Sequence, residues 1–298
     1  MQKKGKMRMF GVIVNPVSGG GENGRLAARV GEILDRRGQA YRLFETENVG
    51  DGDRQTRRAL ESGCTAVVCI GGDGTLSEIV DALMDSGCVL YIVPGGTGND
   101  FARALGLPRD PIKAFEAQLD GRLTDVDCGT INGRAFINVS GSGFDVDVLR
   151  KTEELKPFYP GKRAYRRAVV AVVRDYRPFR AELSVDDGAF QPISGTIVEI
   201  ANGQYIGGGM RVAPGARMQD GLFDVVTVGC VPRLLIPLLL PLFIGGAHVH
   251  LPVAKAVRAK RAVLRAKGMV VNIDGRLEQM DEARYEIRPS ALRMKLPV

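Results

Sequence analysis

Two glycine-rich segments that follow apolar runs constrain the fold of this chain more than any other feature. Thr65–Ile70 is a continuous apolar run that leads into Gly71-Gly72-Asp73-Gly74-Thr75, and Cys88–Val93 leads into the segment 94–100, Pro-Gly-Gly-Thr-Gly-Asn-Asp. Continuous apolar runs are typical of parallel strands buried on both faces. The two loops begin 23 residues apart, the length of one strand and one helix. Because parallel strands end at one edge of their sheet, we predict that the loops lie side by side.

A third polar segment with glycine, Asn15-Pro16-Val17-Ser18-Gly19, follows the apolar run Phe10–Val14. Apolar residues at helical spacing follow this segment and the loop at 71–75. The order of strand, helix, strand, helix predicts an α/β domain with a three-layer architecture and a parallel-rich sheet over residues 1–124. The three loops are expected to converge at the carboxyl edge of that sheet.

The residue types of these loops indicate a phosphate site. Glycines let the backbone approach phosphate oxygens, and the following helix offers free N–H groups and the positive end of its dipole. Asp73 would repel phosphate unless a cation lay between them, which makes Mg²⁺ the expected third party. None of the three loops, as bounded above, fits the GxxxxGK[ST] pattern of a P-loop or the GxGxxG dinucleotide fingerprint.

Past Thr124 the periodicity changes to that of short strands separated by turns. Asn132-Gly133, Asp186-Asp187-Gly188 and Asp274-Gly275 are predicted turns. They favour a β-rich, antiparallel, sandwich-like second domain over residues 125–298. The last ten or so residues, with the strand Ala291–Leu296, could pack on either domain.

The charge balance narrows the class of partner. The chain has 41 Lys and Arg against 34 Asp and Glu, a net charge of +7, which favours nucleotide phosphates, an anionic membrane surface or nucleic acid. Nucleic acid is the least favoured, because the chain has no Trp and no evident aromatic platform. The longest apolar stretch, Leu234–Ile244, is too short to span a bilayer, and the run Met9–Val14 is too short for the apolar part of a signal peptide. The chain has no CxxC spacing. We expect a cytoplasmic protein that associates peripherally with membranes.

Two segments of the second domain allow two interpretations. Lys162–Arg180 is rich in arginine, and Pro232–Ala247 is rich in leucine at helical spacing. Each could be a helix that packs on the core with one solvated face. The alternative is a membrane-surface role, in which the basic groups bind anionic headgroups and the leucines insert among the lipids.

Further motifs follow along almost the whole chain. They are Asn15-Pro16 with Ser18-Gly19, Gly71–Thr75, Pro94–Arg103, Gly141-Ser142-Gly143-Phe144-Asp145, Gly207-Gly208-Gly209, Ala213-Pro214 and Asp220-Gly221-Leu222-Phe223-Asp224. In this order they resemble the bacterial diacylglycerol kinase-like lipid kinases, relatives of diacylglycerol, sphingosine and ceramide kinases. The resemblance implies an ATP- and Mg²⁺-dependent kinase that phosphorylates the hydroxyl of diacylglycerol or a related lipid at an anionic membrane surface.

The resemblance also implies site residues. ATP would be held by Asn15, Pro16, Val17, Ser18, Gly19, Thr46, Gly71, Gly72, Asp73, Gly74, Thr75, Leu76, Ser77, Glu78, Thr97, Asn99 and Asp100. Asp73 would lie near the phosphates and the metal. A structural Mg²⁺ would be bound by the Asp220 carboxylate and the carbonyls of Arg217 and Leu222, an oxygen set that suits a hard cation.

One position departs from the family pattern. The family's catalytic base is the glutamate of an Asp-Gly-Glu triplet, whereas this chain has Asp274-Gly275-Arg276, and a guanidinium cannot accept a proton. Three interpretations follow: Glu278 acts as a displaced base, Asp73 or a metal-bound water serves instead, or the chain is a silent nucleotide- or lipid-binding member of the fold. A soluble-substrate kinase resembling NAD kinase is a further alternative, because such enzymes also carry the GGDGT loop. The sequence is compatible with a homodimer as well as with a monomer.

Overall fold

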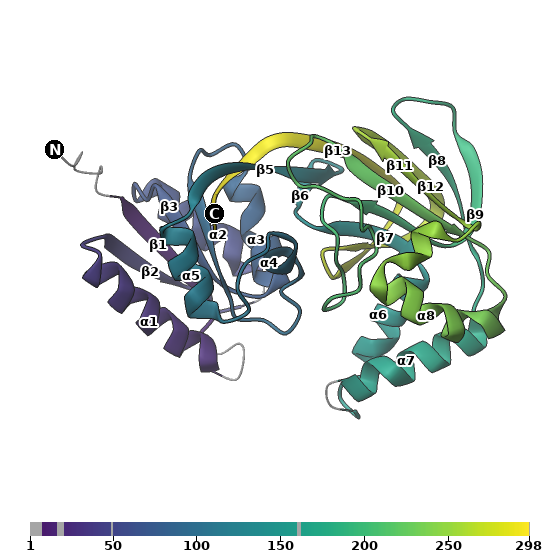
Figure 1. The fold of residues 1–298 in the computed structure, drawn as a ribbon, viewed down its shortest axis with the longest axis horizontal. Coiled ribbons are helices and arrows are strands. Elements are labelled where there is room, and N and C mark those ends of the chain that lie inside the picture. The colour runs from purple at the N-terminus through teal and green to yellow at the C-terminus, as the bar shows by residue number, and fades with distance from the viewer. Residues whose placement is uncertain (1–7, 17–20, 49, 160–161, 298) are drawn as a thin grey trace. The chain divides into compact units, whose positions relative to one another are not determined.

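The computed structural model describes residues 8–16, 21–48, 50–159 and 162–297. The chain divides into two compact units (Figure 1). Unit 1 comprises Met1–Cys128 and Ser290–Val298, and unit 2 comprises Gly129–Pro289. The expected boundary at 124/125 lies inside strand β5 (Arg122–Ile131), so the division falls slightly later, and the end of the chain belongs to unit 1.

Four parallel strands form the centre of unit 1, in the order β2-β1-β3-β4. They are β1 (Met9–Val14), β2 (Ala40–Glu45), β3 (Ala66–Gly71) and β4 (Val89–Pro94). The helices of this unit are α1 (Glu22–Arg36), α2 (Asp51–Glu61), α3 (Asp73–Leu83), α4 (Asp100–Ala104) and α5 (Pro111–Leu119). β3 and β4 are buried at every position, as their continuous apolar sequences predict.

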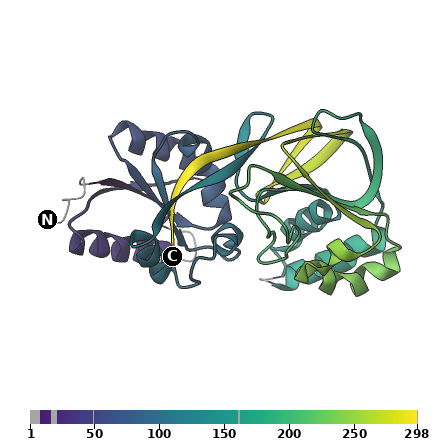
Figure 2. The same cartoon turned by 45° about the horizontal axis from the view of Figure 1, so that its top comes forward.

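Helices cover both faces of this sheet (Figure 2). Phe10, Val68 and Tyr91 point to one face and pack with residues of α1 and α5. Val67 and Ile92, on the other face, are equally buried, and α2 and α3 contact β1 and β3 there. The prediction of an α/β unit followed by a β-rich unit is confirmed. In unit 1, β2, β1, β3 and β4 pair in parallel. Most strand pairs of the described chain are nevertheless antiparallel, because they lie in unit 2.

Unit 2 is built on antiparallel strands in the order β11-β10-β9-β7-β12-β13. The strands that begin here are β6 (Arg134–Phe136), β7 (Val139–Gly143), β8 (Phe179–Val185), β9 (Gln191–Ala201), β10 (Phe223–Gly229), β11 (Ala254–Ala259), β12 (Arg261–Ile273) and β13 (Arg276–Leu296). β7 and β8 each pair with both β9 and β12. The long strands β9 and β12 are therefore connected through β7 at one end and through β8 at the other.

The turns and the last strand follow from local chemistry. Asn132, Asp186 and Asp274 adopt φ values of 48°, 46° and 48°, the left-handed conformation that Asn and Asp tolerate, and each lies in a predicted turn between strands. These three turns are confirmed. β13 pairs with β12 in unit 2, and its residues Arg293 and Met294 pair with β4 in unit 1, which answers where the final strand packs.

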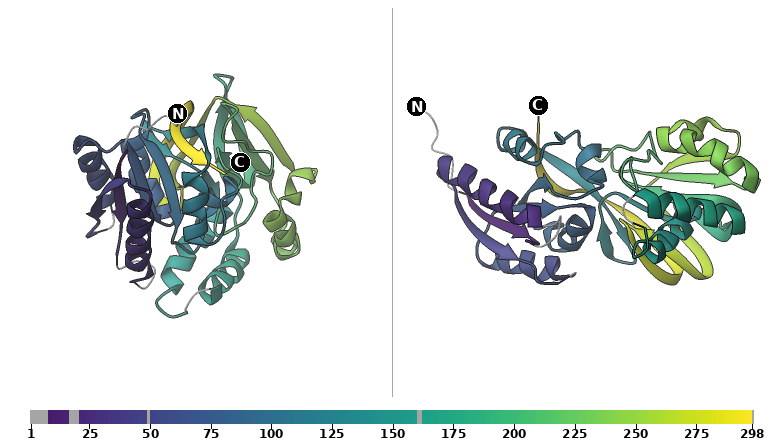
Figure 3. Two further views of the ribbon diagram at one scale, coloured as in Figure 1. Left: turned by 60° about the vertical axis from the view of Figure 1, so that its left-hand side comes forward. Right: turned by 90° about the horizontal axis from the view of Figure 1, so that it is seen from below.

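Three helices lie together in unit 2: α6 (Phe144–Leu155), α7 (Lys162–Asp175) and α8 (Ile236–Gly245), with the short 3-10 helices η2 (Arg233–Leu235) and η3 (Ala247–His250) beside α8 (Figure 3). α6 packs against α7 and against β7, β9 and β12. The basic segment 162–180 is helical only to Asp175, and its last arginine, Arg180, lies in β8.

Candidate active site

The loops after β3 and β4 touch each other through their glycines. The Gly95 N–H donates to the Gly71 carbonyl at 2.9 Å. A Cβ built on Gly96 would overlap the Cα of Gly72, so no other residue fits at Gly96 without moving the backbone. The prediction that these loops lie side by side is confirmed.

The start of α1 joins these loops at the same edge. Asn23, in the first turn of α1, is buried, and a Cβ on Gly95 would overlap its Oδ1. Asn15 and Pro16 come directly after β1, which lies next to β3. Val17, Ser18 and Gly19 lie outside the described residues. The described residues on either side of the first loop, Asn15 and Pro16 before it and Asn23 after it, therefore support the convergence of the three loops.

Asp73 joins the loop after β3 to the loop after β4. Its Oδ2 accepts the N–H of Asp100 at 3.0 Å and its Oδ1 accepts that of Phe101 at 3.1 Å, so the carboxylate caps the start of α4. Both oxygens are thus engaged within unit 1. In this arrangement Asp73 holds the loop geometry, and its predicted role near phosphate and metal stays a prediction.

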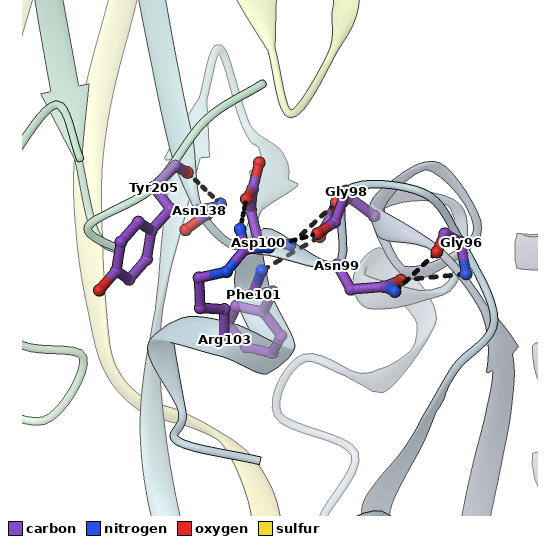
Figure 4. A network of polar contacts seen from close by, with 9 residues as sticks. Gly96, Gly98, Asn99, Asp100, Phe101, Arg103, Asn138 and Tyr205 are labelled. Carbon is purple, nitrogen blue, oxygen red and sulfur yellow. Dashed lines mark hydrogen bonds and ion pairs between the residues drawn. The ribbon is translucent and has the colours of Figure 1, made fainter. Parts of the chain in front are cut away.

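Side chains of the second loop also bond within the loop (Figure 4). Asn99, at a φ of 52°, accepts from the Gly96 N–H at 3.0 Å and donates to the Gly96 carbonyl at 2.7 Å. The Asp100 carboxylate is ion-paired with Arg103, whose guanidinium also donates to the Gly98 carbonyl at 3.2 Å. These contacts fix the loop before any ligand binds.

The other residues predicted to bind the nucleotide differ in exposure and in the hydrogen bonds that they already make. Thr97 is exposed and Gly74 has open space where a side chain would be, so both leave room for a ligand. Thr46 is buried and its N–H donates to Val14, while Glu78 accepts the Gly52 N–H at 3.1 Å. Leu76 is buried and its N–H donates to Gly72, so it supports α3 rather than presenting a contact group.

The predicted metal ligands of unit 2 form one turn before β10. Asp220 Oδ1 accepts the Leu222 N–H at 3.1 Å, and Asp220 Oδ2 is ion-paired with Arg258. A carboxylate can accept about four hydrogen bonds or ligands, so these oxygens and the carbonyls of Arg217 and Leu222 fit a hard cation in kind. A cation at this position would have to compete with Arg258 for the carboxylate.

A second acid lies in the same region and was not predicted as a site residue. Asp224 is buried, one of its oxygens has no hydrogen-bond partner, and burial raises its pKa. It stands opposite Arg258 in the pairing of β10 with β11. Over the ranges that the structure describes, no group of three or more His, Cys, Asp or Glu side chains is arranged for a metal.

The turn that departs from the family pattern connects β12 to β13. The Asp274 carboxylate accepts the N–H groups of Ile137, Asn138 and Val139 at 2.7, 2.9 and 3.2 Å, which fixes the start of β7 to this turn. Asn138 in turn donates to the Tyr205 carbonyl (Figure 4).

Glu278, the predicted displaced base, is ion-paired with Arg134 at 2.6 Å. Its carboxylate therefore already has a cationic partner, and its catalytic role stays a prediction.

The sequence analysis did not identify three polar residues of unit 2 as a site: Glu199 and Asn272, which are buried, and Asp145, which is half-buried. Glu199 is 0% exposed and neither carboxylate oxygen has a hydrogen-bond partner. Asn272 donates to Asp145 Oδ2 at 3.4 Å. Burial raises the pKa of Asp145 to about 6 and that of Glu199 well above its ordinary value. Asp145 was recognised only as part of a motif, and no spacing links it to the other two residues.

Comparisons with known proteins place these features in context. Residues 9–131 match the diacylglycerol kinase catalytic domain, and residues 138–296 match the YegS C-terminal NAD kinase beta sandwich-like domain. The chain is 34% identical to a "Probable lipid kinase YegS-like" of Pseudomonas fluorescens, over 85% of this chain and 84% of the relative. It is 29% identical to a "Diacylglycerol kinase" of Bacillus subtilis, over 90% of each chain.

Solved structures show the same fold at lower identity. A crystal structure of a diacylglycerol kinase from Bacillus anthracis matches with a TM-score of 0.71 and 20% identity, over 99% of this chain and 98% of that one. An NAD kinase from Archaeoglobus fulgidus, solved in complex with ATP, matches with a TM-score of 0.54 and 13% identity, over 97% and 94%.

Proposed function

The chain belongs to the diacylglycerol kinase-like lipid kinases, and from this premise we propose that it transfers the γ-phosphoryl group of ATP to the hydroxyl of diacylglycerol or a related membrane lipid. The observation that carries the proposal is the contact between the glycine loops at 71–75 and 94–100, at the ends of neighbouring parallel strands. Ligands bind outside the carboxyl ends of such strands.

In this proposal the loops of unit 1 bind the phosphates of ATP. α3 begins directly after Gly72, so the positive end of its dipole favours an anion there. Gly74 and Thr97 leave room for the nucleotide, and Asp73 keeps the two loops together. Binding energy is then spent on positioning, which is the main demand of phosphoryl transfer.

Mg²⁺ is part of the proposal. It would be held in unit 2 by the Asp220 carboxylate and the carbonyls of Arg217 and Leu222, with Arg258 displaced from Asp220. Mg²⁺ bound with ATP would neutralise the charge of the phosphate oxygens, whereas the ion at Asp220 would be structural. The support in this chain is the oxygen-only character of the predicted ligands.

We also propose that unit 2 meets an anionic membrane surface through α7, η2 and α8. Leu234 and Leu238 are 83% and 73% exposed, whereas Leu239 and Phe243 on the same helical segment pack inward. α7 contacts η2 and exposes arginines, including Arg163 and Arg166. Leucines beside cationic side chains suit an interface with anionic lipids. None of the helices in the described ranges has the length and apolar content to cross a bilayer.

The function is tested by incubating the purified chain with γ-labelled ATP, Mg²⁺ and vesicles that contain diacylglycerol. We expect label in the lipid. Label in NADP⁺ when NAD⁺ is supplied instead would favour the NAD kinase-like alternative.

A silent member of the fold is the second candidate, because Arg276 stands where the family has glutamate. If the native chain labels no lipid but its Arg276→Glu variant does, the native chain is this silent member.

The membrane proposal has its own test in vesicle sedimentation. Leu238→Glu should reduce binding to anionic vesicles strongly. Val257→Glu is the matched control, because Val257 is also apolar and is 50% exposed, but lies on β11. Equal losses in both variants would contradict the proposed surface.

A further inference from the structure

A row of residues across three strands of unit 2 brings Glu199 toward Asn272. Glu199 on β9 pairs with Gly141 on β7, and Gly141 pairs with Asn272 on β12. A Cβ on Gly141 would overlap the Glu199 carboxylate, so this side chain lies across the glycine. Glu199 and Asn272 are thus on one face of the sheet, the face that α6 covers.

Asn272 links Asp145 to the turn that carries Arg276. Its Nδ2 donates to Asp145 Oδ2 at 3.4 Å, and its Oδ1 accepts the Gly275 N–H at 2.8 Å. Asp145 is therefore one side chain away from the Asp274-Gly275-Arg276 turn. The family places its proton acceptor at the third residue of this turn. In this chain the third residue is Arg276, whose side chain is a guanidinium.

The free oxygen of Asp145 lacks a donor. Oδ1 is shut off from solvent and has no hydrogen-bond partner, although the residue as a whole is only half-buried. A buried acceptor without a donor costs about 1–3 kcal/mol, and a donor supplied by a ligand would remove that cost. A substrate hydroxyl is a donor of the required kind.

The groups that face Asp145 decide which acid is ionised. They are Glu199 from β9, Tyr165 from α7, Tyr285 from β13 and Asp147 on α6 itself. None of these four is a cation. Burial raises the pKa of Asp145 to about 6, and burial together with repulsion by Asp145 raises that of Glu199 well above its ordinary value. Above about pH 6 Asp145 is a carboxylate, the form that can accept a proton.

We infer that Asp145 accepts the hydroxyl proton of the lipid substrate, in place of the glutamate that Arg276 replaces, and this inference rests on the proposed function. The proton moves from the hydroxyl to Asp145 Oδ1. The hydroxyl oxygen forms a bond to the γ-phosphorus of ATP, and the bond from that phosphorus to the β–γ bridging oxygen breaks, leaving its electron pair on ADP. Asp145 then passes the proton to water that enters as the products leave. Asn272 and Glu199 act as positioning residues.

The test uses the full chain with γ-labelled ATP, Mg²⁺ and diacylglycerol vesicles. Asp145→Asn should lower kcat by about a hundredfold or more, while melting temperature and ATP affinity stay near native. Adding Arg276→Glu to Asp145→Asn should recover part of the rate, because the turn then carries a carboxylate. Glu153→Gln, an exposed acid on α6 that pairs with Lys156, is the matched control and should keep native kcat.

A second measurement separates catalysis from support of the fold. The native rate should rise with pH through about 6 and then level, because Asp145 must be deprotonated to accept. Asn272→Ala removes the hydrogen bond that lowers the pKa of Asp145, so this rise should move to higher pH. A merely structural role of Asn272 would lower the rate equally at every pH.

The outcomes distinguish the inference from the proposed function. An active native chain whose Asp145→Asn variant has unchanged kcat overturns the inference and leaves the function standing. A silent native chain with an active Arg276→Glu variant also overturns it. No labelled lipid from either chain overturns the proposed function itself, and the role of Asp145 falls with it.

Discussion

The two units differ in how the polar side chains of their candidate sites are hydrogen-bonded. In unit 1 the acids and amides of the loops are bonded to backbone within the loops, as with Asp73 on the amides of Asp100 and Phe101 and Asn99 on Gly96. In unit 2, Glu199, Asp145 and Asp224 keep buried oxygens without partners. Unit 1 is therefore prepared by its own hydrogen bonds, whereas unit 2 keeps unmet hydrogen-bonding capacity where its substrate would act.

This difference separates two kinds of site. A phosphate site needs backbone N–H groups held in place, which glycine contacts and caps provide before ATP arrives. A proton acceptor needs a pKa near the working pH, which requires a carboxyl group that is buried and incompletely bonded. The hydrogen bonds of the phosphate site stabilise the fold, whereas the buried, incompletely bonded carboxyl group of the proton acceptor destabilises it.

The largest effect is expected where two loop backbones touch. Gly96→Ala should destabilise unit 1 by about 1–3 kcal/mol and remove ATP binding, because the new Cβ overlaps Gly72. Gly74→Ala is the stability control: its Cβ meets nothing, so its melting temperature should equal or exceed the native one. Calorimetry with ATP and thermal melts measure both. Equal destabilisation by the two variants would contradict the contact between the loops.

The next effect concerns the acid that unit 2 buries without a partner. The folded pKa of Glu199 is raised, so folded chains hold this proton more tightly than unfolded ones, and stability falls as pH rises from the ordinary value toward the raised one. Glu199→Gln should remove this loss, about 1.4 kcal/mol for each unit by which the pKa is raised. Denaturant melts from acid to neutral pH measure it. An unchanged pH slope in the variant would mean that Glu199 has a partner in solution.

A smaller effect is expected at the cap that joins the loops. Asp73→Asn keeps one acceptor oxygen instead of two, so it should cost about 1 kcal/mol and weaken ATP binding by letting α4 shift. Asp110 caps α5 through the N–H groups of Ile112 and Lys113 and provides the control. Asp110→Asn keeps Oδ1, the oxygen that accepts both N–H groups, so it should change neither stability nor ATP affinity by much. An equal loss of ATP affinity in both variants would show that the cap of α4 contributes no more to ATP binding than the cap of α5.

The smallest effect tests whether Arg258 competes with a cation for Asp220. Their ion pair is half-exposed, so Arg258→Leu should change stability by less than about 1 kcal/mol. Without the guanidinium, added Mg²⁺ should raise the melting temperature more than in the native chain. Asp220→Asn should abolish this dependence. A melting temperature that ignores Mg²⁺ in all three chains would remove the metal from unit 2.

The sequence predicted unit 1 better than unit 2. The glycine loops are adjacent because β3 and β4 are neighbouring parallel strands, and the spacing of 71–75 and 94–100 already implies that order. The turns at Asn132 and Asp274 followed from residue types that tolerate positive φ.

The cluster of Asp145, Glu199 and Asn272 depends instead on the register of three antiparallel strands and on where α6 covers them. Register over long sequence separations leaves no periodic signal, so this part of the site needed coordinates. The same holds for Asp73: its position was predicted, but its bonds to the amides of α4 were not.

The most direct test is the rate of labelled phosphate transfer from ATP to diacylglycerol by the native chain as a function of pH. Our account predicts labelled lipid, formed at a rate that climbs through about pH 6 and is level at neutral pH. Absence of labelled lipid at every pH, with ATP bound and Mg²⁺ supplied, would contradict it.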